Sequence, residues 1–259
     1  MITTPTWKTR FENYENLLKE LEQERNKPKT SLRFNKAALT ASDIASQFYC
    51  EKKLEMENVH GKVVTEAKIA GTRNHEKLLE TATEVKKEYL WRKIHEPEPI
   101  FALEWLLVAR YKTTLLIGRP DSVRFQNGQP QIVFEYKFSR SGIAYPAYHI
   151  QARTYGILLG NMGFNTDNMH YSIIVADPEQ KNQNTLQQEA MDAITENGLQ
   201  ETMLQIQNAN IYLQKFNRQA AEKNLEWALQ YWQQAREAQR ADNPNKCLKC
   251  EYQTKCNNK

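Results

Sequence analysis

The stretch Leu115–Gly142, LLIGRPDSVRFQNGQPQIVFEYKFSRSG, places charged residues inside two runs that otherwise have strand character. The runs flank Asn127-Gly128, a pair typical of a two-residue hairpin turn. Asp121 begins the first run. Glu135 and Lys137 stand two residues apart in the second, so they share one face of their strand. Because a buried charge is costly without a partner, these three charges need a common explanation.

Two explanations are open. Converging carboxylates can hold a hard divalent cation, and a lysine beside them can orient a water or stabilise charge on a phosphate, which together hydrolyse a phosphodiester. In the structural alternative, Asp121 caps a turn, and Glu135 and Lys137 form a half-exposed ion pair at a sheet edge.

The hairpin geometry sets a condition on the first explanation. With a strict two-residue turn, Asp121 would lie opposite Phe134, and Glu135 would point to the other face of the sheet. We therefore expect an odd loop or a β-bulge that brings Asp121 opposite Glu135.

Segments around the hairpin predict the rest of the core. Strand character is found at residues 101–111, 113–118, 121–125 and 131–138. These segments predict an antiparallel meander. Helical spacing after Pro146 and a short apolar run at 169–177 predict a strand–helix–strand crossover. The Gln-rich segment from about 184 to 240 is expected to be helical.

Helices are also expected before the sheet. One, over about residues 9–25, carries an apolar stripe made of Trp7, Phe11, Tyr14, Leu18 and Leu21. This stripe either docks on the chain's own core or contacts a partner or a second copy. Thr40–Asp43 precedes a helix that carries Cys50, and a further helix over about 63–82 contains His75.

Composition limits the function only loosely. The 259 residues are 40% hydrophobic and 25% charged, and the net charge of +4 permits a nucleic-acid partner without requiring one. The chain has no secretory apolar region and no apolar run near the ~20 residues of a membrane span. We therefore expect a cytoplasmic protein with no membrane partner.

The four cysteines do not resemble a secreted disulfide framework. Cys247, Cys250 and Cys256 are close together, whereas Cys50 lies far upstream. Four thiolates can hold an iron–sulfur cube or a zinc ion, and their spacing alone also allows no metal.

Taken together, the motifs resemble a known family. They are Arg119-Pro120-Asp121, Glu135-Tyr136-Lys137, Gln151-x-x-x-Tyr155 and the upstream His75. This order and spacing is similar to the PD-(D/E)XK nucleases of the RecB type. With the four cysteines, the chain resembles the iron–sulfur branch of that group, which includes CRISPR-adaptation exonucleases and the AddB nuclease domain. The resemblance spans roughly Ala41 to Cys256.

The resemblance implies a fold and a set of roles. The fold would be α/β (α+β): a restriction-endonuclease-like core with a mixed central sheet flanked by helices, its terminal segments clamped by a cysteine-bound cluster. Mg²⁺ or Mn²⁺ would be held by His75, Asp121, Glu135 and the carbonyl of Tyr136. Lys137 would act with Asp121 and Glu135 in catalysis, and the substrate would contact Gln151 and Tyr155. Separately from the resemblance, the basic residues Arg119 and Arg153 near the site either follow the DNA backbone or belong to a solvated sheet rim. A [4Fe–4S] cluster, or alternatively Zn²⁺, would bind Cys50, Cys247, Cys250 and Cys256.

The expected organisation is an N-terminal helix and linker (1–35), a nuclease core (36–180) and C-terminal helices with the cysteine-rich tail (181–259). The expected function is a DNA exonuclease acting on single-stranded or frayed ends in CRISPR spacer acquisition or repair, with CRISPR integration proteins or a second copy as candidate partners. The rival is a catalytically silent subunit that binds DNA or protein.

Overall fold

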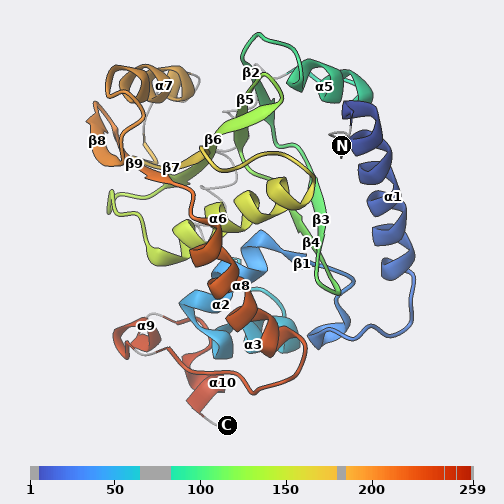
Figure 1. Cartoon of the computed structure of the whole chain (residues 1–259). Helices are drawn as coiled ribbons and strands as arrows, with labels where there is room; N and C mark the ends of the chain where they lie inside the picture. The colour runs from blue at the N-terminus through green and yellow to red at the C-terminus, as the bar shows by residue number, and fades with distance from the viewer. Residues whose placement is uncertain (1–5, 65–82, 180–184, 242, 249, 258–259) are drawn as a thin grey trace.

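Two β-sheets form the centre of the structure, a computed structural model that describes residues 6–64, 83–179, 185–241, 243–248 and 250–257 (Figure 1). The strands are β1 (Leu39–Thr40), β2 (Ile100–Leu103), β3 (Leu107–Tyr111), β4 (Thr114–Gly118), β5 (Ser122–Gln126), β6 (Gln129–Phe138), β7 (His170–Ala176), β8 (Thr202–Ile206) and β9 (Ala209–Lys215). One sheet has the order β2-β5-β6-β7-β9-β8, and the other has the order β1-β4-β3.

Helices surround these sheets. They are α1 (Trp7–Arg25), the 3₁₀ turn η1 (Arg33–Asn35), α2 (Ala41–Tyr49), α3 (Glu51–His60), α5 (Lys87–Ile94), α6 (Pro146–Asn161), α7 (Leu186–Glu196), α8 (Arg218–Trp232), α9 (Asn245–Leu248) and α10 (Gln253–Asn257). Because β6 and β7 are parallel while the other pairs of the larger sheet are antiparallel, the sheet is mixed. The expected mixed sheet flanked by helices is confirmed.

The hairpin of β5 and β6 contains the predicted bulge. Its turn is Asn127-Gly128, and both residues have positive φ, 52° and 72°. The pairs near the turn are followed by a register shift, since Phe125 pairs with Pro130 and Arg124 pairs with Ile132. Gln131 is thus the extra residue of β6. Beyond the shift Ser122 pairs with Phe134, so the same register continues to Asp121 opposite Glu135.

Helix α6 makes the predicted crossover between β6 and β7, which are parallel. Pro146 starts the helix at its first turn, where the missing N–H has no intrahelical partner to lose. A close approach fixes where α6 lies: a Cβ on Gly118 of β4 would be 2.8 Å from Cε1 of Tyr155. Glycine at this position therefore lets the Tyr155 ring lie directly against β4.

Alternating residues of the larger sheet build two separate cores. Val133 of β6 and Tyr171 of β7 face the core that includes α6, whereas Phe134 and Tyr136 face the core that includes α7. This period-two alternation places Glu135 and Lys137 on the α6 side of the sheet with Val133. In Figure 1, α6 and α7 lie on different sides of the sheet.

The N-terminal helix docks on the chain's own core, which was one of the two expectations for its apolar stripe. Tyr14 is buried, its hydroxyl donates to the Leu106 carbonyl at 2.9 Å, and its ring packs on Trp91 and Trp105 at centroid distances of 5.5 and 5.9 Å. Figure 1 shows α1 running along β3 at one edge of the molecule.

Two expectations for the sheet were wrong. The predicted single meander is divided between two sheets, because β3 pairs with β4 while β2 pairs with β5. The segment expected to be helical from about 184 to 240 contains the hairpin of β8 and β9. Its strands alternate buried Ala209, Ile211 and Leu213 with polar residues, a period that the high Gln and Asn content of the region obscures.

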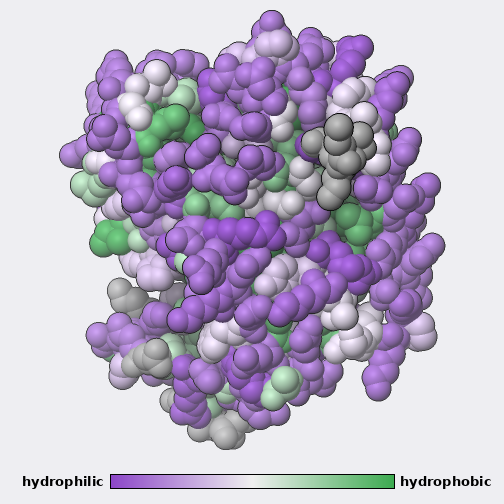
Figure 2. All heavy atoms as spheres, viewed as in Figure 1, coloured by the Kyte–Doolittle hydropathy of each residue, from purple (hydrophilic) through white to green (hydrophobic). Residues whose placement is uncertain are grey.

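Two further expectations from the sequence concern a membrane-spanning helix and the helix that carries His75. In the part of the chain that the structure describes, every helix is too short or too polar to cross a bilayer. The helix expected over about 63–82 carries His75, and residues 65–82 lie outside the described residues. The face of the molecule in Figure 2 is mostly hydrophilic, with small hydrophobic groups between hydrophilic residues.

Candidate active site and thiol pocket

A chain of hydrogen bonds joins β6 to α6 and to Arg119, the residue that follows β4. Nζ of Lys137 donates to Oε1 of Glu135 at 2.6 Å and to Oε1 of Gln151 at 3.2 Å. Nε2 of Gln151 donates to the Tyr155 hydroxyl at 2.8 Å, and that hydroxyl donates to the Arg119 carbonyl at 3.1 Å. Five of the predicted site residues therefore form one network, to which Arg119 contributes its carbonyl.

Asp121 is held beside this network by the backbone of β6. Its Oδ2 accepts a hydrogen bond from the Tyr136 amide at 2.6 Å. The amide and carbonyl of one strand residue point toward the same neighbouring strand, so the Tyr136 carbonyl faces the side on which Asp121 lies. The bulge at Gln131 makes this possible, because without it Asp121 would be opposite Phe134.

Burial and charge act together on the ionisable groups of the network. Glu135 is 2% exposed. Burial by itself lowers the pKa of Lys137, but the carboxylates of Glu135 and Asp121 outweigh it, and the pKa is raised above its ordinary value. Burial, reinforced by the same two carboxylates, raises the pKa of Tyr155 well above its ordinary value. At neutral pH, Lys137 is thus a cation and Tyr155 is a neutral hydrogen-bond donor.

Tyr148 belongs to this site and was not predicted from the sequence. Its ring centroid lies 5.1 Å from Nζ of Lys137, which is a cation–π distance. Tyr148 precedes Gln151 by three residues on α6, so the two share a helix face. That spacing was the available signal, although an aromatic residue on a helix is more often part of the core.

The two predicted basic residues have different surroundings. Arg119 directs its guanidinium to the Glu104 carbonyl at 3.4 Å and is exposed. Arg153 donates to the Tyr171 hydroxyl on β7 at 3.2 Å. Arg153 is therefore held by β7, whereas Gln151, which is itself bonded to Tyr155, contacts Lys137.

The chemistry of the donor set fits a hard divalent cation, since Asp121 and Glu135 offer carboxylate oxygens on one side of the sheet. Within the described segments, no three His, Cys, Asp or Glu side chains are arranged to hold a metal. The predicted third ligand, His75, lies outside those segments.

The four cysteines line one small pocket of about 30 Å³, together with Tyr49 and Lys53. Cys50 lies between α2 and α3, while the other three come from the tail around α9 and α10 (Figure 1). All four are free thiols. The fold thus brings the segment between α2 and α3 to the C-terminal tail, although, as stated for the described segments, the thiols do not have a metal-binding arrangement.

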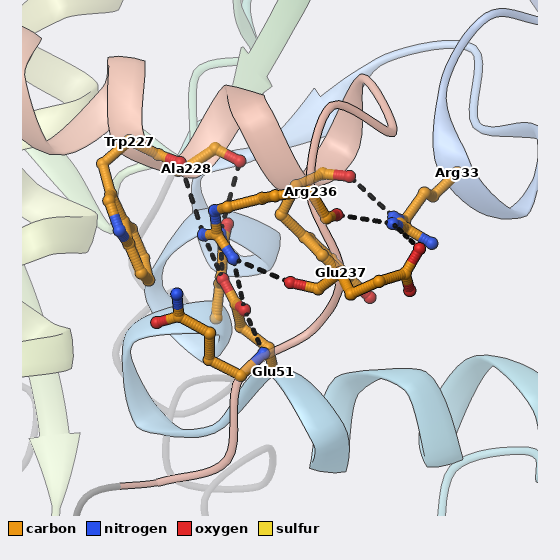
Figure 3. Close-up of polar contacts among 9 residues, drawn as sticks. Arg33, Glu51, Trp227, Ala228, Arg236 and Glu237 are labelled. Carbon is orange, nitrogen blue, oxygen red and sulfur yellow. Dashed lines mark hydrogen bonds and ion pairs between the residues drawn. The ribbon is translucent and has the colours of Figure 1, made fainter.

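A buried ion pair, which the sequence analysis did not detect, fastens the tail next to this pocket (Figure 3). Glu51 follows Cys50 directly and is 2% exposed. Its carboxylate accepts from Nη1 and Nη2 of Arg236 at 2.7 and 2.5 Å, from the Gln239 amide at 2.6 Å and from Nε2 of Gln47 at 2.6 Å. This is a two-pronged guanidinium–carboxylate pair, to which a backbone amide and a side-chain amide add two further donors.

Arg236 is also held by contacts with Trp227 and Arg33. Its guanidinium lies 4.3 Å from the Trp227 ring centroid, and its carbonyl accepts from Nη2 of Arg33 at 2.6 Å (Figure 3). Burial by itself raises the pKa of Glu51, but the hydrogen bonds from Arg236, Gln239 and Gln47 outweigh it and lower the pKa. The segment after α8 is therefore anchored to the start of α3 by protein groups alone.

The chain belongs to the PD-(D/E)XK nuclease superfamily, whose family model matches residues 16–257. Members of this superfamily generally use Mg²⁺ or Mn²⁺. Among curated proteins, none matches the sequence significantly.

Two solved structures are similar in outline. "Crystal structure of SSO0001" is 14% identical, with 94% of this chain and 95% of that chain covered and a TM-score of 0.47. An alkaline exonuclease (LHK-Exo) from Laribacter hongkongensis is 11% identical, with 76% and 88% covered and a TM-score of 0.41. At these levels of similarity we draw no inference from either protein.

Proposed function

We propose that the protein is a metal-dependent deoxyribonuclease that removes nucleotides from single-stranded or frayed DNA ends. The observation that carries the proposal is the network in which Lys137 contacts Glu135 and Gln151 beside Asp121. An ordinary ion pair at the surface would not require a buried carboxylate, or the side-chain amide of a residue on a neighbouring helix. The structural alternative, a half-exposed pair at a sheet edge, leaves this network unexplained, because Glu135 is buried in the middle of the sheet.

In this proposal Asp121, Glu135 and the Tyr136 carbonyl, with His75, are the ligands of Mg²⁺ or Mn²⁺. The bound cation makes water a better nucleophile and offsets charge on the phosphate. Lys137, kept protonated by the two acids, orients the attacking water and stabilises the negative charge that develops on the phosphate oxygens. Gln151 and Tyr155 hold the lysine in place and contact the substrate, while Arg119 and Arg153 attract the DNA backbone.

The direct test is incubation of the purified protein with end-labelled single-stranded DNA in Mg²⁺, in Mn²⁺ and in EDTA. We expect progressive shortening from an end with either cation and none in EDTA. Internal products at early times would change the proposal to an endonuclease. If DNA binds but stays intact with both cations, the protein is the silent binding subunit instead.

We also propose that Cys50, Cys247, Cys250 and Cys256 bind one [4Fe–4S] cluster, with Zn²⁺ as the alternative occupant. The support is the shared pocket, which collects one thiol from the segment between α2 and α3 and three from the C-terminal tail. Thiolates suit either occupant. The role is structural, because a metal held by Cys50 and the tail cysteines closes most of the chain into a loop.

Cys250→Ala should remove the metal and cost stability, since a comparable structural site contributes on the order of 10 kcal/mol to folding. Anaerobic metal analysis and thermal unfolding measure the two effects. We expect about four irons per chain in the parent protein, a colourless, aggregating Cys250→Ala variant, and a brown, soluble Asp121→Asn variant as control. About one zinc and no iron would establish the alternative, and an active protein with four free thiols would remove the metal proposal.

We propose that the enzyme works in the cytoplasm, where thiols stay reduced, in CRISPR spacer acquisition or DNA repair, with CRISPR integration proteins or a second copy as partners. Co-purification from cells that express the integration proteins, with and without nuclease treatment of the lysate, tests for a protein-mediated complex.

A further inference from the structure

We infer that Tyr145, backed by Tyr148, is a stacking site for an unpaired base of the DNA strand. The inference rests on the proposed nuclease function and adds to it the part of the substrate that is recognised. It concerns residues 139–145, the loop that leads from β6 into α6, which we call the platform loop.

The platform loop exposes apolar surface beside the site. Ile143 is 52% exposed and Tyr145 is 45% exposed. Figure 2 shows a small hydrophobic group at the left edge of this face, over the loop between β6 and α6 in Figure 1. The surface around this group is hydrophilic.

The exposed ring is connected to the predicted catalytic lysine by one other ring. Tyr145 packs edge-on against Tyr148, with centroids 5.6 Å apart and planes at 82°. Tyr148 in turn lies 5.1 Å from Nζ of Lys137. A strand whose phosphate lies at Lys137 therefore passes its neighbouring nucleotides over Tyr145.

The platform loop is held in a fixed position, which lowers the ordering cost of binding. The Gly142 carbonyl accepts from Nδ2 of Asn210 at 3.0 Å and from the Tyr212 hydroxyl at 2.7 Å, both on β9. The Ile143 amide donates to the Ser141 hydroxyl at 3.3 Å. Gly142 has φ of +62°, a conformation that glycine adopts without strain.

A polar hollow of about 200 Å³ borders the same loop and gives room for the sugar and phosphate of a stacked nucleotide. Its lining includes Ser139, Arg140, Asp177, Asn208 and Asn210. Every base has an aromatic face, so stacking of this kind is tolerant of sequence, but bases inside a duplex already stack on their neighbours. The site therefore favours single-stranded or frayed ends.

The test compares Tyr145→Ala with two matched variants in anisotropy titrations of a fluorescent thymidine oligonucleotide, in EDTA to prevent cleavage. Loss of one stacked base should weaken binding about tenfold. Tyr145→Phe keeps the ring and should bind as the parent does. Tyr89→Ala removes an equally exposed ring, 44%, from α5, which Figure 1 shows away from the platform loop, and should also bind as the parent does.

A second oligonucleotide of the same length, built from tetrahydrofuran abasic units, separates base stacking from backbone contacts. We expect the parent and Tyr145→Ala to bind it equally. In Mg²⁺, Tyr145→Ala should raise KM for the thymidine oligonucleotide about tenfold and change kcat less than about twofold.

Two results would overturn the stacking site: equal binding of the thymidine oligonucleotide by Tyr145→Ala and the parent, or an equal loss of affinity for both oligonucleotides. If the parent still cleaves DNA in that case, only the stacking site fails. If the parent neither binds nor cleaves DNA, the proposed nuclease function fails with it.

Discussion

Asp121→Asn should reduce kcat for DNA cleavage by about 10³-fold, a loss comparable to the removal of one well-placed electrostatic group from an active site. The change removes the negative charge needed to hold the cation. It keeps the shape of the side chain, and the amide oxygen can still accept the Tyr136 N–H that Asp121 accepts at 2.6 Å. Single-turnover cleavage of labelled DNA in Mg²⁺ measures the effect.

The matched control is Asp167→Asn, which changes an exposed aspartate in the loop before β7. It should cleave at the parent rate. Circular dichroism should show the same fold in all three proteins. Normal turnover by a folded Asp121→Asn variant would mean that Asp121 only fixes the β6 backbone.

Glu51→Ala should lower the free energy of unfolding by about 3–5 kcal/mol, the usual cost of removing one partner of a buried ion pair. Arg236 would remain pressed against Trp227 without its carboxylate, and the Gln239 amide would lose its acceptor. Urea unfolding of the metal-free protein, in reductant and chelator, measures the loss without any contribution from a cluster.

Glu222→Ala is the control, because it breaks the exposed pair between Glu222 and Arg218 on α8. That change should cost no more than about 0.5 kcal/mol. Limited proteolysis gives a second measurement, in which Glu51→Ala should be cut after α8 sooner than the control. Equal stability of the two variants would mean that the tail is not anchored by Glu51.

Local patterns predicted the part of the fold that local chemistry determines. Asn127-Gly128 predicted the turn, and the helical spacing after Pro146 predicted α6. The requirement that Asp121 and Glu135 share a face predicted the bulge. The roles assigned to these residues stay predictions. The hairpin of β8 and β9 was missed because apolar Met203 lies on the exposed face of its edge strand and because the region is rich in Gln and Asn.

Contacts between distant segments could not be predicted in the same way. Glu51 and Arg236 are 185 positions apart, and neither stands in a motif, so only the folded chain brings them together. The cysteines were identified as a group because thiols are few and chemically distinctive. The sequence around Tyr145 contains no such signal, because the role proposed for this residue depends on which side of the platform loop faces Lys137.

The bulge at Gln131 has a consequence for how this hairpin can change in evolution. A single residue gained or lost between Asp121 and Glu135 would turn one acid to the opposite face of the sheet, whereas one residue added to each strand would leave both acids facing α6. The constraint on this segment is therefore on whether the number of residues gained or lost is odd or even, and not on the length of the hairpin. Active relatives should tolerate hairpins that are longer or shorter by two residues, and hairpins that differ by one should carry a compensating change in the bulge.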